Sequence, residues 1–438
     1  MSSLNKSPLK DPIPEAIEKN GSSLNLVYLA QAPTTSKNTP LARINKLVPL
    51  SNKSGRLFIN DLNGMLYELK GNKLQLVLKM QDYFKNFISK PGLGSGLGSF
   101  AFHPNYLNNG LFYTSHTEES KNSKKSDFSY HDSIPKKMKW ILTEWKQLNT
   151  AQGTFKGSHR EILTVDVPTQ IHGMQEICFR PDVSKGESDY GKLFIGIGDG
   201  GSAENKFLGL TQSTQKVWGT ILRIDPLGNN SKNGNYGIPN DNPFINTPEA
   251  VGEIWAYGFR NPNRISWDKN SGNMLASDIG HRQIEEINLI KAGGNYGWPF
   301  REGAFALYAK EDMDQVYALD SIEDRNYIAP ILQFDHDEAN AICGGFVYQG
   351  KKIKELRGKY IFGSIVHGKI FSANASEFAL GKFAKIEELD ITYDGKISTL
   401  KKITKNNRVD LRLGVDNEGE LYVFTKADGK IYKISAVN

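Results

Sequence analysis

Residues 419–432 consist of Gly419-Glu-Leu-Tyr-Val and, after a short turn, Asp428-Gly429-Lys-Ile-Tyr432. Two apolar runs separated by a glycine-containing turn predict a β-hairpin. The same pattern occurs at residues 55–67 and again at residues 358–371. Copies this far apart in one chain predict antiparallel sheets repeated around an axis, a β-propeller. At about 60–70 residues for each unit, the chain accommodates six four-stranded blades with long face loops. A pair of stacked β-sandwiches remains the alternative.

Short apolar runs bounded by Gly, Asn and Asp continue along the chain, and sustained helical periodicity is absent, so we expect an all-β fold. Residues 1–23 are polar and predict a disordered leader, whereas residues 24–438 form a single propeller domain. The apolar run at 24–29 is expected to pair with the last blade and close the ring. Residues 118–139 are predicted to be a polar, basic loop insertion.

Composition excludes several classes of protein. The chain has 438 residues and a net charge of +6, and no apolar run approaches the roughly 18 residues of a membrane-spanning helix. Part of the basic excess lies in one segment, residues 121–139, which predicts a solvated loop rather than a nucleic-acid-binding face, so no nucleic-acid partner is expected. The first residues contain no apolar segment and are not a signal peptide. Cys178 and Cys343 form either one disulfide or two buried thiols.

Two motifs carry candidate chemistry. His172 follows Thr169-Gln-Ile and precedes a glycine, a context that suits a general base with a pKa near neutrality. Arg260 and Arg264, with Asn261 between them, offer forked donors to carboxylates or oxyanions. The alternatives are a structural histidine and arginines that connect blade loops.

Three weaker signals involve glycine and carboxylates. The glycine-rich stretch 196–201 is followed by no helical pattern, so it predicts a tight turn rather than a dinucleotide site. Residues 335–338, Asp-His-Asp-Glu, are either a metal site or a solvated charge run. Glu285 and Glu286, followed by the carbonyl-rich turn 293–298, provide the oxygen ligands that calcium prefers.

Five stretches together resemble the glucose/sorbosone dehydrogenase family, whose members are soluble six-bladed propellers that use pyrroloquinoline quinone (PQQ) and calcium. The resemblance runs from about residue 40 to the C-terminus and is carried by residues 96–105, 193–201, 219–226, 253–262 and 286–299.

This resemblance implies roles for individual residues. His172 matches the catalytic base, which takes a proton from the sugar's anomeric hydroxyl as a hydride passes to the quinone. Arg260 and Asn261 match cofactor-contacting residues. The resemblance also implies two calcium sites. At the first, the backbone carbonyls of Gly280 and His281 hold a calcium ion that bridges to the cofactor. The second is a structural site at Glu286 and Tyr296.

The sequence departs from the family pattern at the cofactor. Val366 stands where the family has a lysine, Asp410 stands where a second arginine could be, and Gly94 replaces a glutamine. Four other residues are candidates to contact the three carboxylates of the quinone: Arg264, His367, Arg408 and Arg412.

Two functions from different classes follow. In the first, the protein oxidises an aldose with PQQ and passes electrons to an external acceptor. In the second, it is a propeller that has lost PQQ and binds a glycan or protein, or performs non-redox sugar chemistry with His172 and Arg260. The resemblance implies a periplasmic or secreted location, and the sequence leaves the sugar, the acceptor and the oligomeric state open.

Overall fold

The computed structural model describes residues 6–50, 54–92, 94–120, 125–151, 153–319 and 327–438.

Four antiparallel sheets of four strands account for much of the chain. The first contains β2 (Ile44–Pro49), β3 (Leu57–Asp61), β4 (Met65–Lys70) and β5 (Lys73–Lys79). The second contains β6 (Leu97–Phe102), β7 (Leu111–Glu119), β8 (Met138–Gln147) and β9 (Gly157–Val167). The third contains β10 (Met174–Phe179), β11 (Leu193–Ile197), β12 (Thr220–Ile224) and β13 (Ile254–Tyr257). The fourth contains β14 (Pro262–Trp267), β15 (Met274–Asp278), β16 (Ile284–Ile290) and β20 (Leu332–Asp335).

A nine-stranded sheet completes the series, and a three-stranded sheet lies outside it. One arm of the larger sheet contains β21 (Ile342–Val347), β22 (Lys359–Ser364), β23 (Ile370–Asn374), β24 (Glu387–Tyr393) and β25 (Lys396–Ser398). The other arm contains β26 (Leu411–Val415), β27 (Leu421–Thr425) and β28 (Lys430–Val437), and β1 (Lys19–Gln31) joins the two arms. The three-stranded sheet contains β17 (Arg301–Glu302), β18 (Phe305–Tyr308) and β19 (Asp312–Tyr317).

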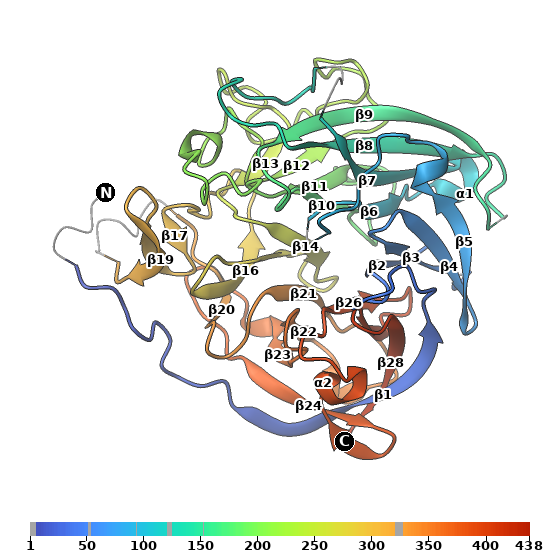
Figure 1. The fold of residues 1–438 in the computed structure, drawn as a ribbon, viewed down its shortest axis with the longest axis vertical. Coiled ribbons are helices and arrows are strands. Elements are labelled where there is room, and N and C mark those ends of the chain that lie inside the picture. Colours follow the sequence, from blue (N-terminus) through green and yellow to red (C-terminus); the bar gives the residue numbers. More distant parts are fainter. Residues whose placement is uncertain (1–5, 51–53, 93, 121–124, 152, 320–326) are drawn as a thin grey trace.

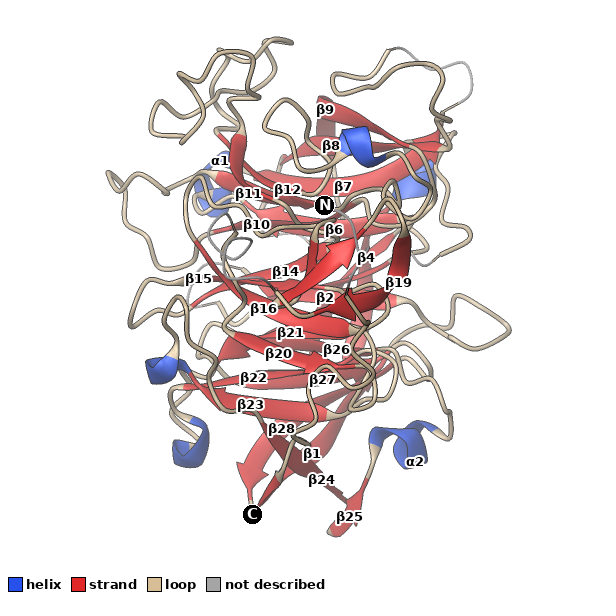
Figure 2. Ribbon diagram, turned by 90° about the vertical axis from the view of Figure 1, so that its left-hand side faces the viewer, coloured by secondary structure: helices blue, strands red, loops and turns tan. Residues whose placement is uncertain are grey.

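The sheets follow one another around the molecule (Figure 1), and Figure 2 shows their strands edge-on from the side. The first strands of the sheets and arms pack against each other in a closed series: β2 on β6, β6 on β10, β10 on β14, β14 on β21, β21 on β26 and β26 on β2. These inner strands therefore line a central axis, as in a β-propeller. The expectation of an all-β fold with four-stranded antiparallel sheets is confirmed.

Helical structure in the described residues is confined to short turns. These are α1 (Tyr106–Asn109), α2 (Leu400–Thr404) and 3₁₀ turns at Met80–Asp82, Leu208–Leu210, Lys354–Leu356 and Ala375–Glu377. No helix in the described part of the chain has the length and apolar character needed to cross a membrane.

The core lies between neighbouring sheets. Trp140 and Leu163 of the second sheet pack with Ile177, Ile195 and Leu222 of the third, and all five are fully buried. Burial of each aliphatic side chain contributes about 1.5–3 kcal/mol, which ties adjacent sheets together. Both cysteines are free thiols, so the alternative of a disulfide between Cys178 and Cys343 is wrong.

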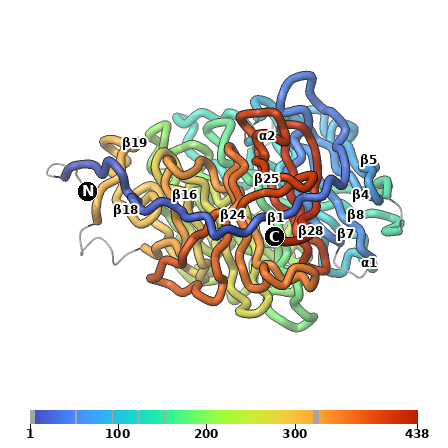
Figure 3. Tube along the Cα trace, turned by 90° about the horizontal axis from the view of Figure 1, so that it is seen from below, coloured from blue at the N-terminus to red at the C-terminus, as the bar shows by residue number. Residues whose placement is uncertain are grey.

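The N-terminal part of the chain differs from the predicted disordered leader. β1 begins at Lys19, pairs parallel with β24 and antiparallel with β28, and buries Leu24 and Leu26. Closure with the last sheet agrees with the sequence prediction. Residues 6–18 also lie along the body, as the blue segment in Figure 3 shows. Their polar composition predicts disorder, but their backbone N–H groups find acceptors on the body of the protein. For example, the N–H of Leu9 donates to the Val316 carbonyl at 2.9 Å.

The predicted insertion at 118–139 is the connection between β7 and β8. The two strands extend into it and pair Glu118 with Lys139 and Glu119 with Met138. Within the connection, Phe128 forms an isolated parallel bridge with Val165 of β9. Because residues 128 and 165 pair, the described part of this loop is folded against its own sheet.

Candidate active site

His172 lies in the turn that leads into the inner strand β10. Its backbone has a φ of 52°, a left-handed conformation that is uncommon for a non-glycine residue. The N–H of Gly200 donates to the His172 carbonyl at 2.9 Å, which holds this turn on the turn after β11. A Cβ at Gly198 would lie 2.5 Å from that carbonyl oxygen, so glycine at this position is what lets the two turns meet.

Asp199 fixes the orientation of the His172 ring. Nδ1 of His172 lies 2.8 Å from Oδ1 of Asp199, and both residues are buried. The same carboxylate accepts the N–H of Gly201 at 2.7 Å and the indole Nε1–H of Trp298 at 3.1 Å. A carboxylate held by several donors cannot rotate away, so the imidazole is held with Nδ1 toward Asp199.

The environment of His172 favours its neutral form. Burial is the largest cause that lowers its pKa below the usual 6.5, and the charge of Arg260 lowers it further, against the opposing effect of Asp199. No described residue forms a hydrogen bond with Nε2 of His172. A neutral imidazole with Nδ1 engaged and Nε2 available is arranged to accept a proton.

Arg260 is held beside this pair by Glu204. Its Nη2 donates to Oε1 of Glu204, and its Nη1 donates to the Ile279 carbonyl at 3.0 Å. Nδ1 of His281 lies 3.3 Å from the same Glu204 oxygen. Burial opposes ionisation of Glu204, but the hydrogen bond from His281 and the charge of Arg260 hold its pKa well below the usual range. Glu204 thus connects Arg260 and His281, and the charge of Arg260 acts on His172.

Two buried polar atoms beside this network have no partner among the described residues: Nε of Arg260 and Oδ1 of Asn261. The backbone N–H groups of both residues donate to the two carboxylate oxygens of Asp278, at 2.8 and 2.5 Å. Asp278 therefore positions the start of β14, while two side-chain atoms are left for a ligand to satisfy.

Asp278 is one of three buried carboxylates that interact electrostatically with one another, together with Glu286 and Glu302. Glu286 is its partner across the β15–β16 pair, and its pKa is raised by burial first and then by the charge of Asp278. Burial also raises the pKa of Asp278. The third carboxylate, Glu302, accepts the N–H groups of residues 281–284 on Oε1, while its Oε2 is buried without a partner in the described chain. A buried carboxylate oxygen without a donor suits a hard cation.

The other predicted calcium residues contribute differently. The N–H of Gly280 donates to Glu285 at 3.1 Å, and the N–H of His281 donates to Glu302 at 2.7 Å. The Tyr296 hydroxyl donates to the Leu289 carbonyl and accepts the Lys291 N–H, and its ring stacks on Phe259. Glu286 and Glu302 thus belong to the cluster of buried carboxylates with Asp278. The hydroxyl of Tyr296 instead bonds to the backbone of Leu289 and Lys291.

A second group, which we call the channel cations, surrounds Asn45 of β2 and consists of Arg264, Arg412 and Lys426. Oδ1 of Asn45 accepts from Lys426 Nζ at 2.9 Å and from Arg412 Nε at 3.2 Å, and its carbonyl accepts from Arg264 at 2.5 Å. Arg264 also pairs with Glu176 at 3.1 Å. No ion pair neutralises Lys426 or Arg412 within the described residues.

Positive charge is therefore in excess at the channel cations. Burial lowers the pKa of Arg412 to about 10, with a further contribution from the charge of Arg264. Burial and the charge of Arg412 lower the pKa of Lys426 well below its usual value. Buried like charges are costly unless an anion compensates them, so this group fits a polyanionic ligand.

Two other predicted cofactor residues are less buried than the channel cations. Arg408 has half of its side chain exposed and pairs with Asp410 at 2.8 Å. His367 is partly buried, and burial together with the charges of Lys401 and Lys369 lowers its pKa.

The sequence prediction did not include Asp199, Glu204, Lys426 or Asn45. The sequence does mark Asp199 as a candidate, because an aspartate within the glycine-rich turn 196–201 can direct its side chain toward a neighbouring loop. Lys426 lies in an ordinary hairpin turn, and nothing local distinguishes it.

The chain is similar to known proteins in sequence and in fold. The model of the family described as Glucose / Sorbosone dehydrogenase matches residues 46–433. The chain is 28% identical over 255 residues to the aldose sugar dehydrogenase YliI of Escherichia coli, covering 57% of this chain and 58% of that protein. It is 27% identical over 325 residues to the HIPL1 protein of Arabidopsis thaliana, covering 66% of this chain and 45% of that protein.

Human Hedgehog-interacting protein is 26% identical over 363 residues, covering 79% of this chain and 44% of that protein. The chain thus spans less than half the length of HIPL1 and of Hedgehog-interacting protein. Among solved structures, the PQQ-bound aldose sugar dehydrogenase of Streptomyces coelicolor has the same fold, with a TM-score of 0.62 and 18% identity over 95% of this chain and 98% of that one. The family match covers most of the chain, and we conclude that the protein belongs to the glucose/sorbosone dehydrogenase family.

Proposed function

We propose that this protein is a PQQ-dependent dehydrogenase that oxidises an aldose at its anomeric carbon. The observation that carries the proposal is the buried His172–Asp199 pair, in which a neutral imidazole is fixed at Nδ1 and available at Nε2. In this proposal Nε2 of His172 takes the proton of the anomeric hydroxyl. Asp199 keeps the proton on Nδ1 and stabilises the imidazolium that forms.

The bound cofactor would supply a two-electron acceptor for the hydride that leaves the anomeric carbon, and an external acceptor would then reoxidise it. The residues present suit its three carboxylates. Arg260 and Asn261 offer unsatisfied buried atoms, and the channel cations offer uncompensated positive charge. Lys426 would supply an ammonium group that Val366 cannot provide.

We further propose that Asp278, Glu286 and Glu302 bind a structural calcium ion, because one buried oxygen of Glu302 has no partner in the described chain and burial raises the pKa of the other two. Calcium should then raise the melting temperature, since a ligand bound only to the native state stabilises it. Glu286→Gln should reduce that increase. An undiminished increase in this variant would place the ion elsewhere.

The family match also supports two broader proposals. We count six blades by treating the two arms of the nine-stranded sheet as separate blades that β1 joins. We propose a periplasmic or secreted location by analogy with the family, to be tested by fractionating cells that express the complete gene.

A second function is favoured by a specific observation, the likeness to Hedgehog-interacting protein over 79% of this chain. In this alternative the propeller presents its face to a protein or glycan and performs no oxidation. The two proposals differ in whether the channel cations bind the quinone.

Reconstitution separates the two functions. The full chain is incubated with PQQ and calcium, and quinone absorbance and aldose-dependent reduction of an artificial dye are measured. We expect both signals, and we expect His172→Ala to abolish dye reduction while retaining cofactor uptake. His131→Ala, which alters an exposed histidine in the β7–β8 connection, is the matched control and should behave as wild type. Absence of uptake at micromolar PQQ would overturn the oxidoreductase proposal and favour the binding function.

A further inference from the structure

The N-terminal segment of residues 6–18 is bonded to the body at a place remote in sequence. The N–H of Ile13 donates to Oδ2 of Asp335, at the end of β20, at 3.1 Å. The N–H of Ile17 donates to Oε1 of Glu338 at 2.9 Å. Pro12 and Pro14 flank Ile13 and restrict the backbone there, which limits the conformations open to this stretch beside the strand end.

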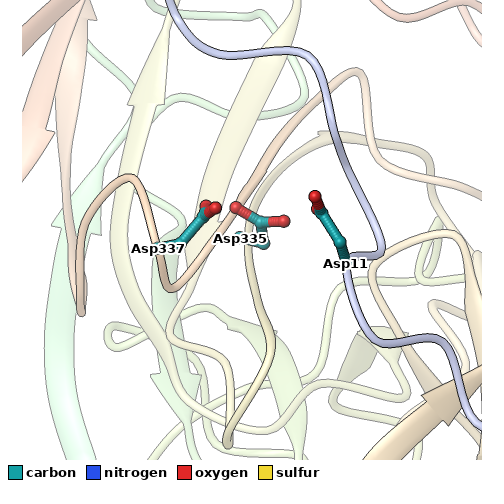
Figure 4. A group of neighbouring side chains, drawn as sticks. All are labelled: Asp11, Asp335 and Asp337. Carbon is teal, nitrogen blue, oxygen red and sulfur yellow. The ribbon is translucent and has the colours of Figure 1, made fainter.

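Three carboxylates converge where this segment crosses β20. Asp11, Asp335 and Asp337 each bring one oxygen within 4.8 Å of the oxygens of the other two. Figure 4 shows the Asp335 carboxylate between the other two, with Asp11 contributed by the N-terminal segment and Asp337 by the loop after β20. Within the described residues, no lysine, arginine or histidine forms an ion pair with any of the three.

Asp335 is the buried member of this acidic triad. The residue is only 3% exposed, whereas Asp11 and Asp337 are exposed. Its Oδ1 is buried and has no hydrogen-bond donor in the described chain, while Oδ2 accepts only the Ile13 N–H. A buried carboxylate oxygen without a donor costs free energy, and burial together with neighbouring Asp337 raises the pKa of Asp335. The site therefore requires either a proton or a cation.

We propose that Asp11, Asp335 and Asp337 bind a calcium ion that fastens the N-terminal segment to the end of β20. All three ligands are hard oxygens from separate chain segments, which suits the flexible coordination of calcium, with water completing the shell on the exposed side. The intervening His336 is not among the converging ligands, and its Nε2 lies 2.9 Å from Oε1 of Glu285. An all-oxygen site disfavours zinc, and the strict octahedral geometry of magnesium is less easily met by such dispersed ligands.

The consequence is a calcium-dependent attachment. Residues 6–18 lead directly into β1, which joins β24 to β28 and closes the ring of sheets. Ion binding at the acidic triad would hold the start of this closing strand. The triad contains none of the residues of the proposed active site, so the two proposals can fail independently.

The test compares calcium stoichiometry and local proteolysis in the full-length protein. Wild type, Asp11→Asn and Asp337→Asn are stripped with a chelator and titrated calorimetrically with calcium. Both substitutions alter exposed side chains, so they should leave folding intact. Asp394→Asn, at an exposed aspartate in the turn between β24 and β25, is the matched control. We expect each triad variant to bind one calcium ion fewer than wild type and the control.

Proteolysis reports on the segment itself. Trypsin at Lys10 and a glutamate-specific protease at Glu15 should cut wild type about 100-fold more slowly at free calcium about 100 times the Kd, because only the attached state binds the ion. The triad variants should lose this protection and the control should keep it. Equal stoichiometry in wild type and Asp337→Asn would overturn the proposal. Protection that follows falling pH and ignores calcium would also overturn it, because the carboxylates would then share a proton.

Discussion

Oδ2 of Asp199 accepts the indole N–H of Trp298 at 3.1 Å, while Oδ1 of the same carboxylate faces Nδ1 of His172 at 2.8 Å. Trp298 is also buried against Leu307 of β18 and Ala203, which links the small three-stranded sheet to the candidate active site. The imidazole is therefore oriented by a carboxylate that is itself held by a tryptophan from a different part of the chain.

Replacement of Asp199 should impair turnover more than binding. Asp199→Asn presents an amide N–H to Nδ1 of His172, which favours the wrong tautomer and removes the negative charge beside the imidazolium. By analogy with other His–Asp pairs we expect kcat to fall by about 10²–10⁴-fold with a smaller change in KM. Trp298→Phe, which loses the indole donor and leaves Asp199 in place, should cause a smaller loss. Dye-reduction kinetics with reconstituted protein measure both, and an unchanged kcat in Asp199→Asn would exclude a positioning role.

The pH dependence of turnover should follow His172. Burial and Arg260 lower its pKa, so the acid limb of kcat should have its midpoint below 6.5, the usual value for histidine. The unfolded chain binds the proton more readily, so the stability that neutral His172 contributes is present above about pH 6.5 and is lost as the pH falls. A pH–rate profile from about pH 4.5 to 8 gives the midpoint. A midpoint above 6.5 would contradict the assigned environment.

Lys426 should affect stability and cofactor binding in opposite directions. Lys426→Met removes a buried charge that faces Arg412, so the cofactor-free protein should gain about 1–4 kcal/mol in free energy of unfolding. The same variant should bind PQQ about 30-fold or more weakly, because about 2 kcal/mol of charge pairing is lost. Lys396→Met, at an exposed lysine of β25, is the control for both measurements. Unaltered PQQ affinity would remove Lys426 from the cofactor site.

The closing strand β1 supplies a stability test that is independent of function. Leu26 is 2% exposed and its neighbour Val27 is 48% exposed on the opposite face. Leu26→Ala should lower the free energy of unfolding by about 2–5 kcal/mol through lost burial and a residual cavity. Val27→Ala should change it by less than about 0.5 kcal/mol. Denaturant unfolding of the two variants compares them directly, and similar values would show that β1 does not close the fold.

Local sequence was sufficient for the elements and their architecture. The hairpins at 55–67, 358–371 and 419–432 are each specified by apolar runs and a glycine turn a few residues apart, and each appears as two adjacent antiparallel strands. His172 and Arg260 were identified because their motifs are contiguous. The described part of the leader was misjudged because β24 pairs with Lys19 and Ser23 and so brings polar residues into a strand.

Only the tertiary structure decided which side chains meet. Asp199 lies 27 residues from His172, Lys426 lies 381 residues from Asn45, and Asp11 meets Asp335 from the opposite end of the chain. Periodicity and turn chemistry act over a few residues, so they determine strands and hairpins. Closure of the sheets around an axis brings distant strand ends together, and that long-range packing creates both the channel cations and the acidic triad.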